Sequence, residues 1–493
     1  MKKKLLFMSL TALILVMIST SALARVDFEQ ELYKKLAQGE NEAPYIKLPD
    51  YKRVELDNKL VLYLVEDHNY PTIEVTGYIE GGRRQETKKL AGISDFMFTM
   101  MNKGTKNYSE QKLARYKELH GIDLGFSVKN DYYKFSGSAL SSEQDELISL
   151  IADILQHPNF KASYYQRIKE ETKRSLAQAK TRQGSLLEMY FKKNIYHDHP
   201  YSFVKDYDLQ QKTLTNITPQ SLDHFYQKNI APNTLVLGVV GDIEIDRIEK
   251  LVKKKFGSWS EQEVRFKEPQ LKMDRSLQNQ IVVVNKPDAT QAKLRMGYNF
   301  YKTGFKDRIA FKMANRVYGG GSFSSRLMKN LRSDKGYVYS IYSRANYNRL
   351  GGVYYINTEV KPQQTYQTVK AIKEEMLAIK EGRKKIKQDE LAENINLYNA
   401  LLPKSYQKKV DILGEIIYNS EIRGRKVDYV NQFIEEYNQL SVEKVQQSFV
   451  QHTYPDRFLT VIVANKEDVV PQFRAEGMQV RVVNQHSEGE SKK

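Results

Sequence analysis

The feature that most constrains this chain is an internal duplication. The stretch KLVLYLVEDHNYPTIEVTGYIEGG, which begins at residue 59, has the pattern of a strand, a proline-containing turn and a second strand. The stretch QNQIVVVNKPDATQAKLRMGYNFYKTG, which begins at residue 278, repeats that pattern. Gly77 and Gly297, each followed by a tyrosine, lie 220 residues apart, and the strand-opening Pro232 and Pro455 lie 223 residues apart. Two nearly equal offsets at opposite ends of each half predict two homologous domains.

Each half alternates such strands with long amphipathic segments, for instance EQDELISLIADILQHPNF and ASYYQRIKEETKRSLAQAKTRQGSLLEMYFKKNIY. This alternation predicts an α+β fold of two duplicated α/β-sandwich domains, each a mostly antiparallel sheet packed with long helices. A polar, proline-containing stretch between the halves is typical of a linker. The expected division is a signal peptide at 1–24, a first domain at 25–260, a linker at 261–274, a second domain at 275–480 and a disordered tail at 481–493.

The N-terminal sequence MKKKLLFMSLTALILVMISTSALA has the pattern of a secretory signal peptide cut after Ala24. Its apolar run, from Leu5 to Ile18, is shorter than the ~20 residues that a membrane-spanning helix needs, so we expect no stable membrane insertion after cleavage. The chain has no cysteine, which excludes disulfides, thiolate metal ligands and a lipid-modified cysteine. We therefore expect an exported protein, in the periplasm of a Gram-negative bacterium.

The formal net charge of +17 raises the question of nucleic-acid binding. The basic residues are interleaved with acidic ones on helix faces such as IKEEMLAIKEGRKKIKQDELAE, which is typical of a solvated surface. We expect no nucleic-acid partner, and the charge by itself supports only a weak attraction to anionic surfaces or acidic substrates.

The chain resembles the pitrilysin/insulinase family of zinc peptidases, the inverted zincins, and in particular its small two-domain bacterial and processing-peptidase type. The resemblance covers nearly the whole chain after residue 24 and rests on the order and spacing of five segments. These segments are LVLYLVEDHNYPTIEVTGYIEGGRRQE, AGISDFMFTMMNKGTKNYS, HDHPY, PNTLVLGVVGD followed by KKKFGSW, and GGGSFSSRLMKNLRSDKGYVYSIYS.

The zinc motif of that family, H-x-x-E-H on a helix, is degenerate in this sequence. Two histidines four residues apart share a helix face and bind zinc, and the glutamate between them is the general base. The matching positions here are Asp95, Phe98 and Thr99, and the later glutamate ligand of the family matches Glu170 or its neighbour Glu171. A phenyl ring cannot accept a proton from water. We therefore expect no metal and no cofactor in this chain.

A replacement site elsewhere has little support in the sequence. His197 and His199 form an H-D-H pair, but two histidines without a third ligand are more often loop residues. No other H-x-x-E-H, no H-E-x-x-H and no lipase-type G-x-S-x-G occurs, and the glycines before Ser322 lack the G-K-[ST] of a phosphate-binding loop.

The second half carries the other part of the family's active site. The sequence predicts a helix from about Ser324 to Asp334, ended by Gly336, and then a strand. Members of the family carry an arginine on this helix and a tyrosine seven residues later, and these match Arg332 and Tyr339. The resemblance implies that the tyrosine donates to the oxyanion and that the arginine orients substrate carbonyls. Taken alone, the arginine is typical of a solvated helix end and the tyrosine of half-buried strand packing.

The first-half positions that match this pair are Lys117 and Leu124, so the pair is present only once. A chain with the pair but without the zinc motif resembles the non-catalytic subunit of a heterodimeric zinc peptidase. We expect a homologous H-x-x-E-H-bearing partner to hold the zinc, and peptides as substrates. Two alternatives remain: a structural or peptide-binding protein of the same fold, and a peptidase acting alone with an altered site around Asp95 and Glu170.

Overall fold

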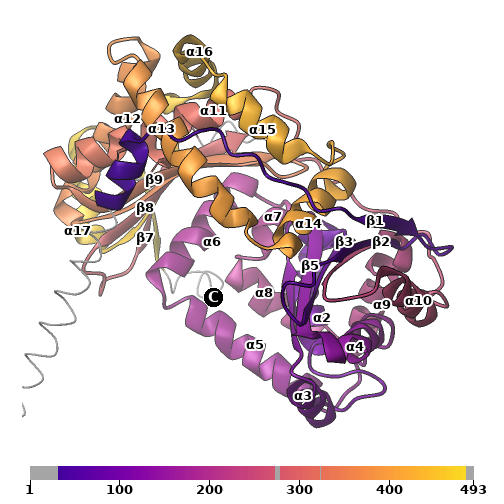
Figure 1. Cartoon of the computed structure of the whole chain (residues 1–493). Coiled ribbons are helices and arrows are strands. Elements are labelled where there is room, and N and C mark those ends of the chain that lie inside the picture. Colours follow the sequence, from indigo (N-terminus) through magenta and orange to yellow (C-terminus); the bar gives the residue numbers. More distant parts are fainter. Residues whose placement is uncertain (1–30, 272–277, 322–323, 485–493) are drawn as a thin grey trace, which may run out of the picture.

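The computed structural model describes residues 31–271, 278–321 and 324–484 (Figure 1). The expected signal peptide at 1–24 lies outside these residues, as do the last positions of the expected linker and residues 485–493 of the expected tail. Within the described ranges, no helix is long and apolar enough to cross a membrane.

The first half forms a six-stranded sheet in the order β1-β2-β6-β3-β5-β4. Strands β2 and β6 pair in parallel and all other neighbours are antiparallel. The bounds are β1 (Lys52–Glu55), β2 (Val61–Glu66), β3 (Thr72–Glu80), β4 (Asp123–Val128), β5 (Tyr132–Leu140) and β6 (Leu235–Gly241).

The second half forms a matching sheet in the order β12-β7-β11-β8-β10-β9. Its β7 pairs in parallel with both β11 and β12, and the remaining neighbours are antiparallel. The bounds are β7 (Ile281–Asn285), β8 (Ala292–Phe300), β9 (Val338–Asn346), β10 (Gly352–Val360), β11 (Leu459–Ala464) and β12 (Val480–Asn484). Two mostly antiparallel sheets packed with helices confirm the predicted α+β class.

The repeated Gly-Tyr pair occupies the same place in both halves. Gly77 and Gly297 are the sixth residues of the nine-residue strands β3 and β8. A Cβ at Gly77 would lie 2.0 Å from the ring of Phe135, and one at Gly297 would lie 2.5 Å from the ring of Phe191. Each glycine therefore leaves room for an aromatic ring to pack directly on the backbone of its strand.

The helices divide between the two sheets. One face of the first sheet packs against α2 (Ile93–Met101), α4 (Gln144–Gln156), α9 (Pro219–Asn229) and α10 (Ile245–Phe256). The other helices of that half are α3 (Glu110–Leu119), α5 (Tyr165–Ala179), α6 (Gln183–Tyr196), α7 (Pro200–Phe203) and α8 (Tyr207–Thr213). The second half adds α11 (Arg308–Asn315), α12 (Thr365–Lys380), α13 (Gln388–Leu401), α14 (Lys409–Ile417), α15 (Tyr429–Asn438), α16 (Val442–His452) and α17 (Lys466–Ala475).

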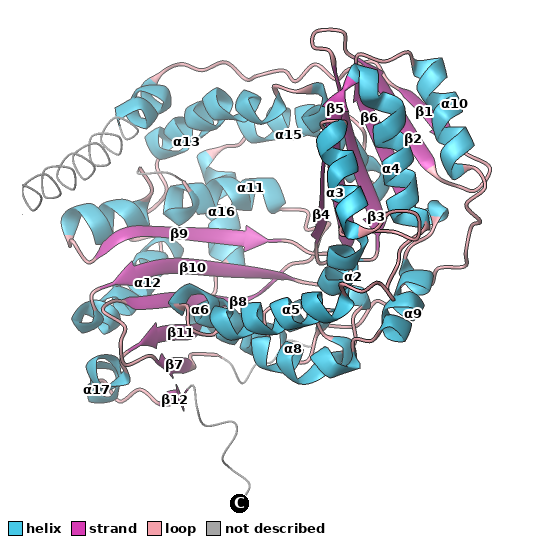
Figure 2. Ribbon diagram, turned by 90° about the horizontal axis from the view of Figure 1, so that it is seen from below, coloured by secondary structure: helices cyan, strands magenta, loops and turns pink. Residues whose placement is uncertain are grey.

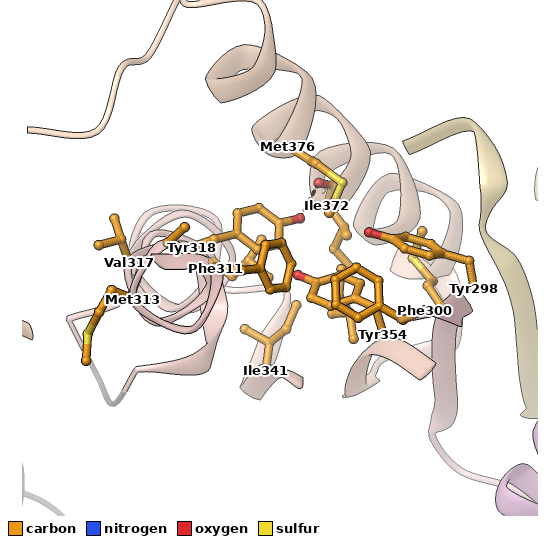
Figure 3. Packing of buried hydrophobic residues seen from close by; sticks show 14 of the residues in the cluster. Tyr298, Phe300, Phe311, Met313, Val317, Tyr318, Ile341, Tyr354, Ile372 and Met376 are labelled. Atoms are coloured by element: carbon orange, nitrogen blue, oxygen red, sulfur yellow. Dashed lines mark hydrogen bonds between the residues drawn. The ribbon is translucent and has the colours of Figure 1, made fainter. Parts of the chain in front are cut away.

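The core of the second half is rich in tyrosines whose hydroxyl groups are hydrogen-bonded. Tyr298, Phe300, Phe311 and Tyr354 form a group of rings in Figure 3, with Tyr318 beyond Phe311. The hydroxyl of Tyr318 donates to the carbonyl of Ile372 at 2.9 Å, and that of Tyr354 to Oδ1 of Asn315 at 2.9 Å. These bonds satisfy polar groups that would otherwise be costly to bury.

Each half also contributes a helix that covers the sheet of the other half. The strands LVLGVVG (β6) and LTVIVA (β11) are buried at every position, so both of their faces need an apolar cover. Helix α14, from the second half, packs on β6 and β3, and α6, from the first half, packs on β11, β8 and β7 (Figure 1). Figure 2 shows the two sheets side by side, with the strands of one running across those of the other. The halves are therefore interlocked.

Two expectations about element boundaries are wrong. The long amphipathic segment from residue 162 to 196 is not one helix but two, because the chain turns at residues 180–182 and α6 leaves α5 to reach the second sheet. The expected tail at 481–493 begins inside the fold, since Val480–Asn484 pairs with β7 as strand β12. The alternating valines of VRVVN supply the apolar side chains for that pairing.

The linker is held in place by the first half. The guanidinium of Arg84 is fully buried and donates to Glu80 at 2.9 Å, to the carbonyl of Gly81 at 3.0 Å and to the carbonyl of Lys267 at 3.4 Å. The same guanidinium lies over the ring of Phe266, 5.2 Å from its centroid. Residues 261–271 have no regular secondary structure, yet these contacts fix their path between the two sheets.

Candidate functional site

Helix α2 carries the positions that match the zinc motif, and a buried carboxylate caps it. Gly92, in the left-handed region with a φ of 86°, precedes the helix. The carboxylate of Glu86 accepts from the backbone N–H of Gly92 at 2.8 Å and of Ser94 at 3.3 Å. Four apolar residues of one face, Ile93, Phe96, Met97 and Met100, are buried in the first core, so the opposite face points outward.

Asp95 and Thr99 share that outward face, and neither is arranged to hold a metal ion. The carboxylate of Asp95 pairs with Arg83 through contacts of 2.9 and 3.2 Å. The hydroxyl of Thr99 donates to the backbone carbonyl of Asp95 at 2.8 Å. The one carboxylate of the motif is therefore paired with a guanidinium, which a metal ion at the same oxygens would have to displace.

Phe98, at the position of the family's general base, is part of the core. Its side chain is 4% exposed, and its ring lies 5.4 Å from that of Phe126 and 4.9 Å from that of Tyr133. A glutamate in this place would be surrounded by aromatic rings, where burial disfavours the charged carboxylate that a general base needs. The packing, and not the sequence change alone, makes this helix unfit for the chemistry of a zinc peptidase.

The later carboxylates lie on α5, which packs against α2 through the rings of Phe96 and Tyr165 at 5.8 Å. Glu170 is exposed, and Glu171 pairs with Arg167 at 2.7 Å. Across residues 31–271, 278–321 and 324–484, no group of three or more histidine, aspartate and glutamate side chains could hold a metal ion. The residues present do not fit the family's zinc.

The two histidines of HDHPY have different environments. His199 is buried, accepts from the backbone N–H of Tyr201 at 3.2 Å through Nδ1 and lies 3.1 Å from the carbonyl of Pro269 through Nε2. His197 is exposed, with a φ of 47°. His199 thus caps the short helix α7 and fastens the linker, which accounts for the motif without a metal.

Arg332 and Tyr339 lie together at the edge of the second sheet. Arg332 is near the end of a π-helical segment, Met328–Asp334, which is shorter than the predicted helix and more widely wound. Gly336, with a φ of 63°, makes the turn into β9, the edge strand of the sheet. The guanidinium of Arg332 lies over the ring of Tyr339 at 5.1 Å, and Tyr339 is 67% exposed. The first-half counterparts differ, since Leu124 is buried and Lys117 donates to Asn102.

Glu86 predicts a pH dependence of stability. Burial raises the pKa of this carboxyl group to about 7, with the charge of Asp95 as the next cause, from an ordinary value of 4.5. The unfolded chain releases this proton first, so the free energy of unfolding falls as the pH rises from 4.5 to about 7 and is level above that range. The parent should therefore lose stability relative to Glu86→Gln as the pH rises. We expect the free energy of unfolding of Glu86→Gln minus that of the parent to increase across this interval by about 2–3 kcal/mol, because the amide still caps α2 without ionising.

Urea unfolding at a series of pH values measures this difference. Glu118→Gln, on the exposed face of α3, is the matched control and is expected to shift stability by less than about 0.5 kcal/mol at every pH. A difference between Glu86→Gln and the parent that stays constant from acid to neutral pH would contradict the assignment.

Two neighbouring cavities, among those between the halves, were not foreseen from the sequence. They have volumes of about 620 and 460 Å³, and Tyr132 of β5 and Tyr418 after α14 line both of them. The rings of these two tyrosines are 5.5 Å apart, and they stand between the two spaces. The walls come from segments hundreds of residues apart, so no local pattern in the sequence could have indicated them.

Comparison with known proteins gives consistent matches. Residues 61–203 match the family described as "Insulinase (Peptidase family M16)", and residues 216–398 match "Peptidase M16 inactive domain". "Uncharacterized zinc protease YmxG" of Bacillus subtilis (strain 168) is 23% identical over 398 residues, which are 80% of this chain and 93% of that protein. "Non-peptidase homolog YmxG" of Helicobacter pylori (strain ATCC 700392 / 26695) is 21% identical over 413 residues, 83% of this chain and 93% of that protein.

A second relative from the same Helicobacter pylori strain, "Zinc protease PqqE", is 23% identical over 394 residues, which are 78% of this chain and 84% of that protein. The crystal structure of a peptidase M16 inactive domain from Pseudomonas fluorescens superposes with a TM-score of 0.74 at 21% identity, covering 84% of this chain and 98% of that one. At this identity, the superposition establishes the fold alone.

Proposed function

Because this chain belongs to peptidase family M16, the insulinase family, we propose that it is the zinc-less subunit of a two-chain zinc peptidase. In this proposal a homologous partner holds the zinc ion with its own H-x-x-E-H helix. This chain brings Arg332 and Tyr339 to that ion from the opposite side. The substrates are peptides and unfolded segments small enough to enter the space between the two chains.

The observation that carries the proposal is the contrast between the two candidate sites. At α2, the zinc position is closed by Phe98 and by the pairing of Asp95 with Arg83. At β9, the phenol of Tyr339 is two-thirds exposed and touches the guanidinium of Arg332. The exposed side chain of Tyr339 is within reach of a second molecule that binds along this sheet edge.

The chemistry follows from the charge that peptide hydrolysis creates. Attack of water on the peptide carbonyl places negative charge on oxygen, and a donor aimed at that oxygen lowers the barrier by about 3–4 kcal/mol. The hydroxyl of Tyr339 is such a donor, and the positive charge of Arg332 stabilises the same anion. Zinc in the partner would activate the water and polarise the carbonyl. An extended substrate would add as a strand to a sheet edge.

The names of the relatives support a division of labour. One organism carries both a "non-peptidase homolog" and a "zinc protease" that are similar to this chain. We propose that two such chains pair here, with both subunits exported to the periplasm under signal peptides such as the one expected at 1–24. The scaffold alternative does not require Arg332 and Tyr339 at these positions, and the packing of Phe98 weighs against a peptidase that acts alone.

Zinc content and cleavage, measured for each chain and for the mixture, test the proposal. The full chain alone is expected to hold no stoichiometric zinc and to cleave no peptide, since its motif supplies a single, neutralised carboxylate. An equimolar mixture with an H-x-x-E-H subunit from the same source is expected to form a stable complex and to cleave peptides. Tight zinc and turnover in the isolated chain would overturn the proposal, and so would a complex that forms but gains no activity.

A further inference from the structure

The smaller of the two neighbouring cavities that share Tyr132 and Tyr418, of about 460 Å³, is called here the basic cavity. It lies among α6, β8, the hairpin that joins β9 to β10, and the turn between β4 and β5. Five basic side chains line it, namely Arg83, Lys129, Lys192, Arg295 and Arg423, against two carboxylates, Asp131 and Glu188.

The carboxylates do not neutralise this charge. Glu188 is shared by two cations, since it forms ion pairs with Lys192, at 3.1 Å, and with Arg295, at 3.3 Å. Asp131 accepts from the hydroxyl of Tyr201 and from the backbone N–H of Arg349, and it forms no ion pair with the basic side chains of the lining. The cavity therefore has more positive charge than its own wall can balance.

Two of the cations have no acidic partner in the part of the chain that the structure describes. Arg423 donates to the hydroxyl groups of Tyr418 and Thr303 and to the carbonyl of Tyr347, all of which are neutral. Lys129 is exposed at the cavity and makes no ion pair with a described residue. A negative group that enters the cavity would meet two unneutralised charges at once.

The basic groups are also held in position before any ligand arrives. The guanidinium of Arg295 lies 5.3 Å from the ring centroid of Phe191 and 4.7 Å from that of Tyr355, and its Nε donates to Asn357 at 3.1 Å. The ammonium group of Lys192 is held by Glu188 at 3.1 Å on a side chain that is 23% exposed, and this burial lowers its pKa. Groups fixed in this way lose little entropy when they bind an anion.

The position of the cavity relates it to Tyr339. Tyr339 lies at the start of β9, whereas the last two residues of that strand, Ala345 and Asn346, line the cavity together with the two residues that follow. A strand rises about 3.3 Å per residue, so roughly 20 Å separates the two places. A peptide in the extended conformation covers that distance with about six residues.

We propose that the basic cavity is a subsite for a peptide carboxylate, either a side chain of aspartate or glutamate or a free C-terminus. The carboxylate lies about six residues from the bond that is cut near Tyr339. This inference rests on the proposed function for the identity of the cleaved bond, while the binding of the carboxylate itself needs no partner subunit. It assigns to the two-chain enzyme a preference for peptides with an acidic residue or terminus at that spacing.

Fluorescence anisotropy with the full chain alone tests the subsite. Three labelled peptides of one sequence are compared: one with an internal aspartate and an amidated end, one with asparagine and a free C-terminus, and one with asparagine and an amidated end. We expect at least one carboxylate peptide to bind about tenfold or more tightly than the neutral peptide at low salt, and the advantage to shrink as salt is added. The first two peptides show which carboxylate is recognised.

Variants assign the effect to the cavity. Lys129→Met removes an exposed cation without breaking an ion pair of the described chain. Lys192→Met removes a half-buried cation of the same cavity. We expect each variant to abolish most of the preference for the carboxylate. Lys254→Met, on the exposed face of α10 and of equal charge change, is expected to leave it intact. Equal affinity for all three peptides, or a preference that survives both cavity variants, overturns the subsite.

The outcomes separate the subsite from the proposed function. Tyr339→Phe is expected to leave peptide affinity unchanged, because the phenol lies at the other end of β9. A failed binding experiment together with activity in the two-chain mixture would remove the subsite alone. Selective binding together with an inactive mixture would keep the subsite and remove the peptidase.

Discussion

Tyr339→Phe is expected to reduce the turnover of the two-chain enzyme by about 10²–10³-fold, with a much smaller effect on KM. The change removes one oxygen atom from an exposed side chain, so the fold and the assembly of the two chains should not be affected. The hydroxyl donates to the oxyanion only as that charge forms, and its loss therefore appears in kcat. Steady-state kinetics of the reconstituted complex provide the measurement.

Tyr342→Phe is the matched control, since it deletes a hydroxyl three residues further along the same strand. Its turnover should stay within about twofold of the parent, because surface changes away from special features have small effects. If Tyr339→Phe retains full turnover in a complex that contains stoichiometric zinc, the assignment of Tyr339 as an oxyanion donor is wrong.

Arg84→Met is expected to lower the free energy of unfolding by about 3–5 kcal/mol, the range for breaking a buried ionic network by removing one partner. The guanidinium has no exposed surface, donates to Glu80 and to two backbone carbonyls, and packs on Phe266. Methionine fills part of the volume but leaves the carbonyls of Gly81 and Lys267 without this donor. Because Lys267 belongs to the connection between the halves, we also expect faster proteolysis of the linker.

Urea unfolding and limited proteolysis measure the two effects of Arg84→Met. Arg247→Met is the control, because that arginine is 53% exposed and forms a surface pair with Asp145 at 2.8 Å. Exposed pairs contribute at most about 1 kcal/mol, so the control should be nearly as stable as the parent. A similar, small effect for both variants would show that the linker is fastened by its other contacts, such as that of His199 with Pro269.

The elements that sequence patterns predicted well are those whose signals are local. The matching Gly-Tyr pairs do occupy equivalent positions on β3 and β8, because a strand with a ring packed over its backbone requires glycine at that point. Pro232 and Pro455 likewise each precede a fully buried strand, β6 and β11. The division of ASYYQ…KNIY into two helices was missed, because both parts share one helical periodicity and the turn between them carries no glycine or proline.

At the candidate sites, too, the sequence indicated the residue types, whereas only the structure showed their contacts. Sequence alone indicated that Asp95, Phe98 and Thr99 do not form a zinc motif, since the residue types are wrong for the chemistry. It did not indicate that Arg83 neutralises Asp95, nor that Phe98 packs between Phe126 and Tyr133. Those contacts depend on a short turn and a hairpin that approach α2 only in the folded chain.

The sequence by itself therefore determined the duplication, the α+β class, the family and the departure from the H-x-x-E-H pattern, because each depends on residue types at fixed local spacings. Only the tertiary structure decided which helix covers which sheet and where the basic cavity lies. Because β6 and β11 are buried on both faces, each needs apolar side chains packed on its second face. The hydrophobic effect is non-directional, so the sequence does not indicate which helix supplies them. The exchange of α6 and α14 between the halves supplies those covers and, with α6, one wall of the basic cavity.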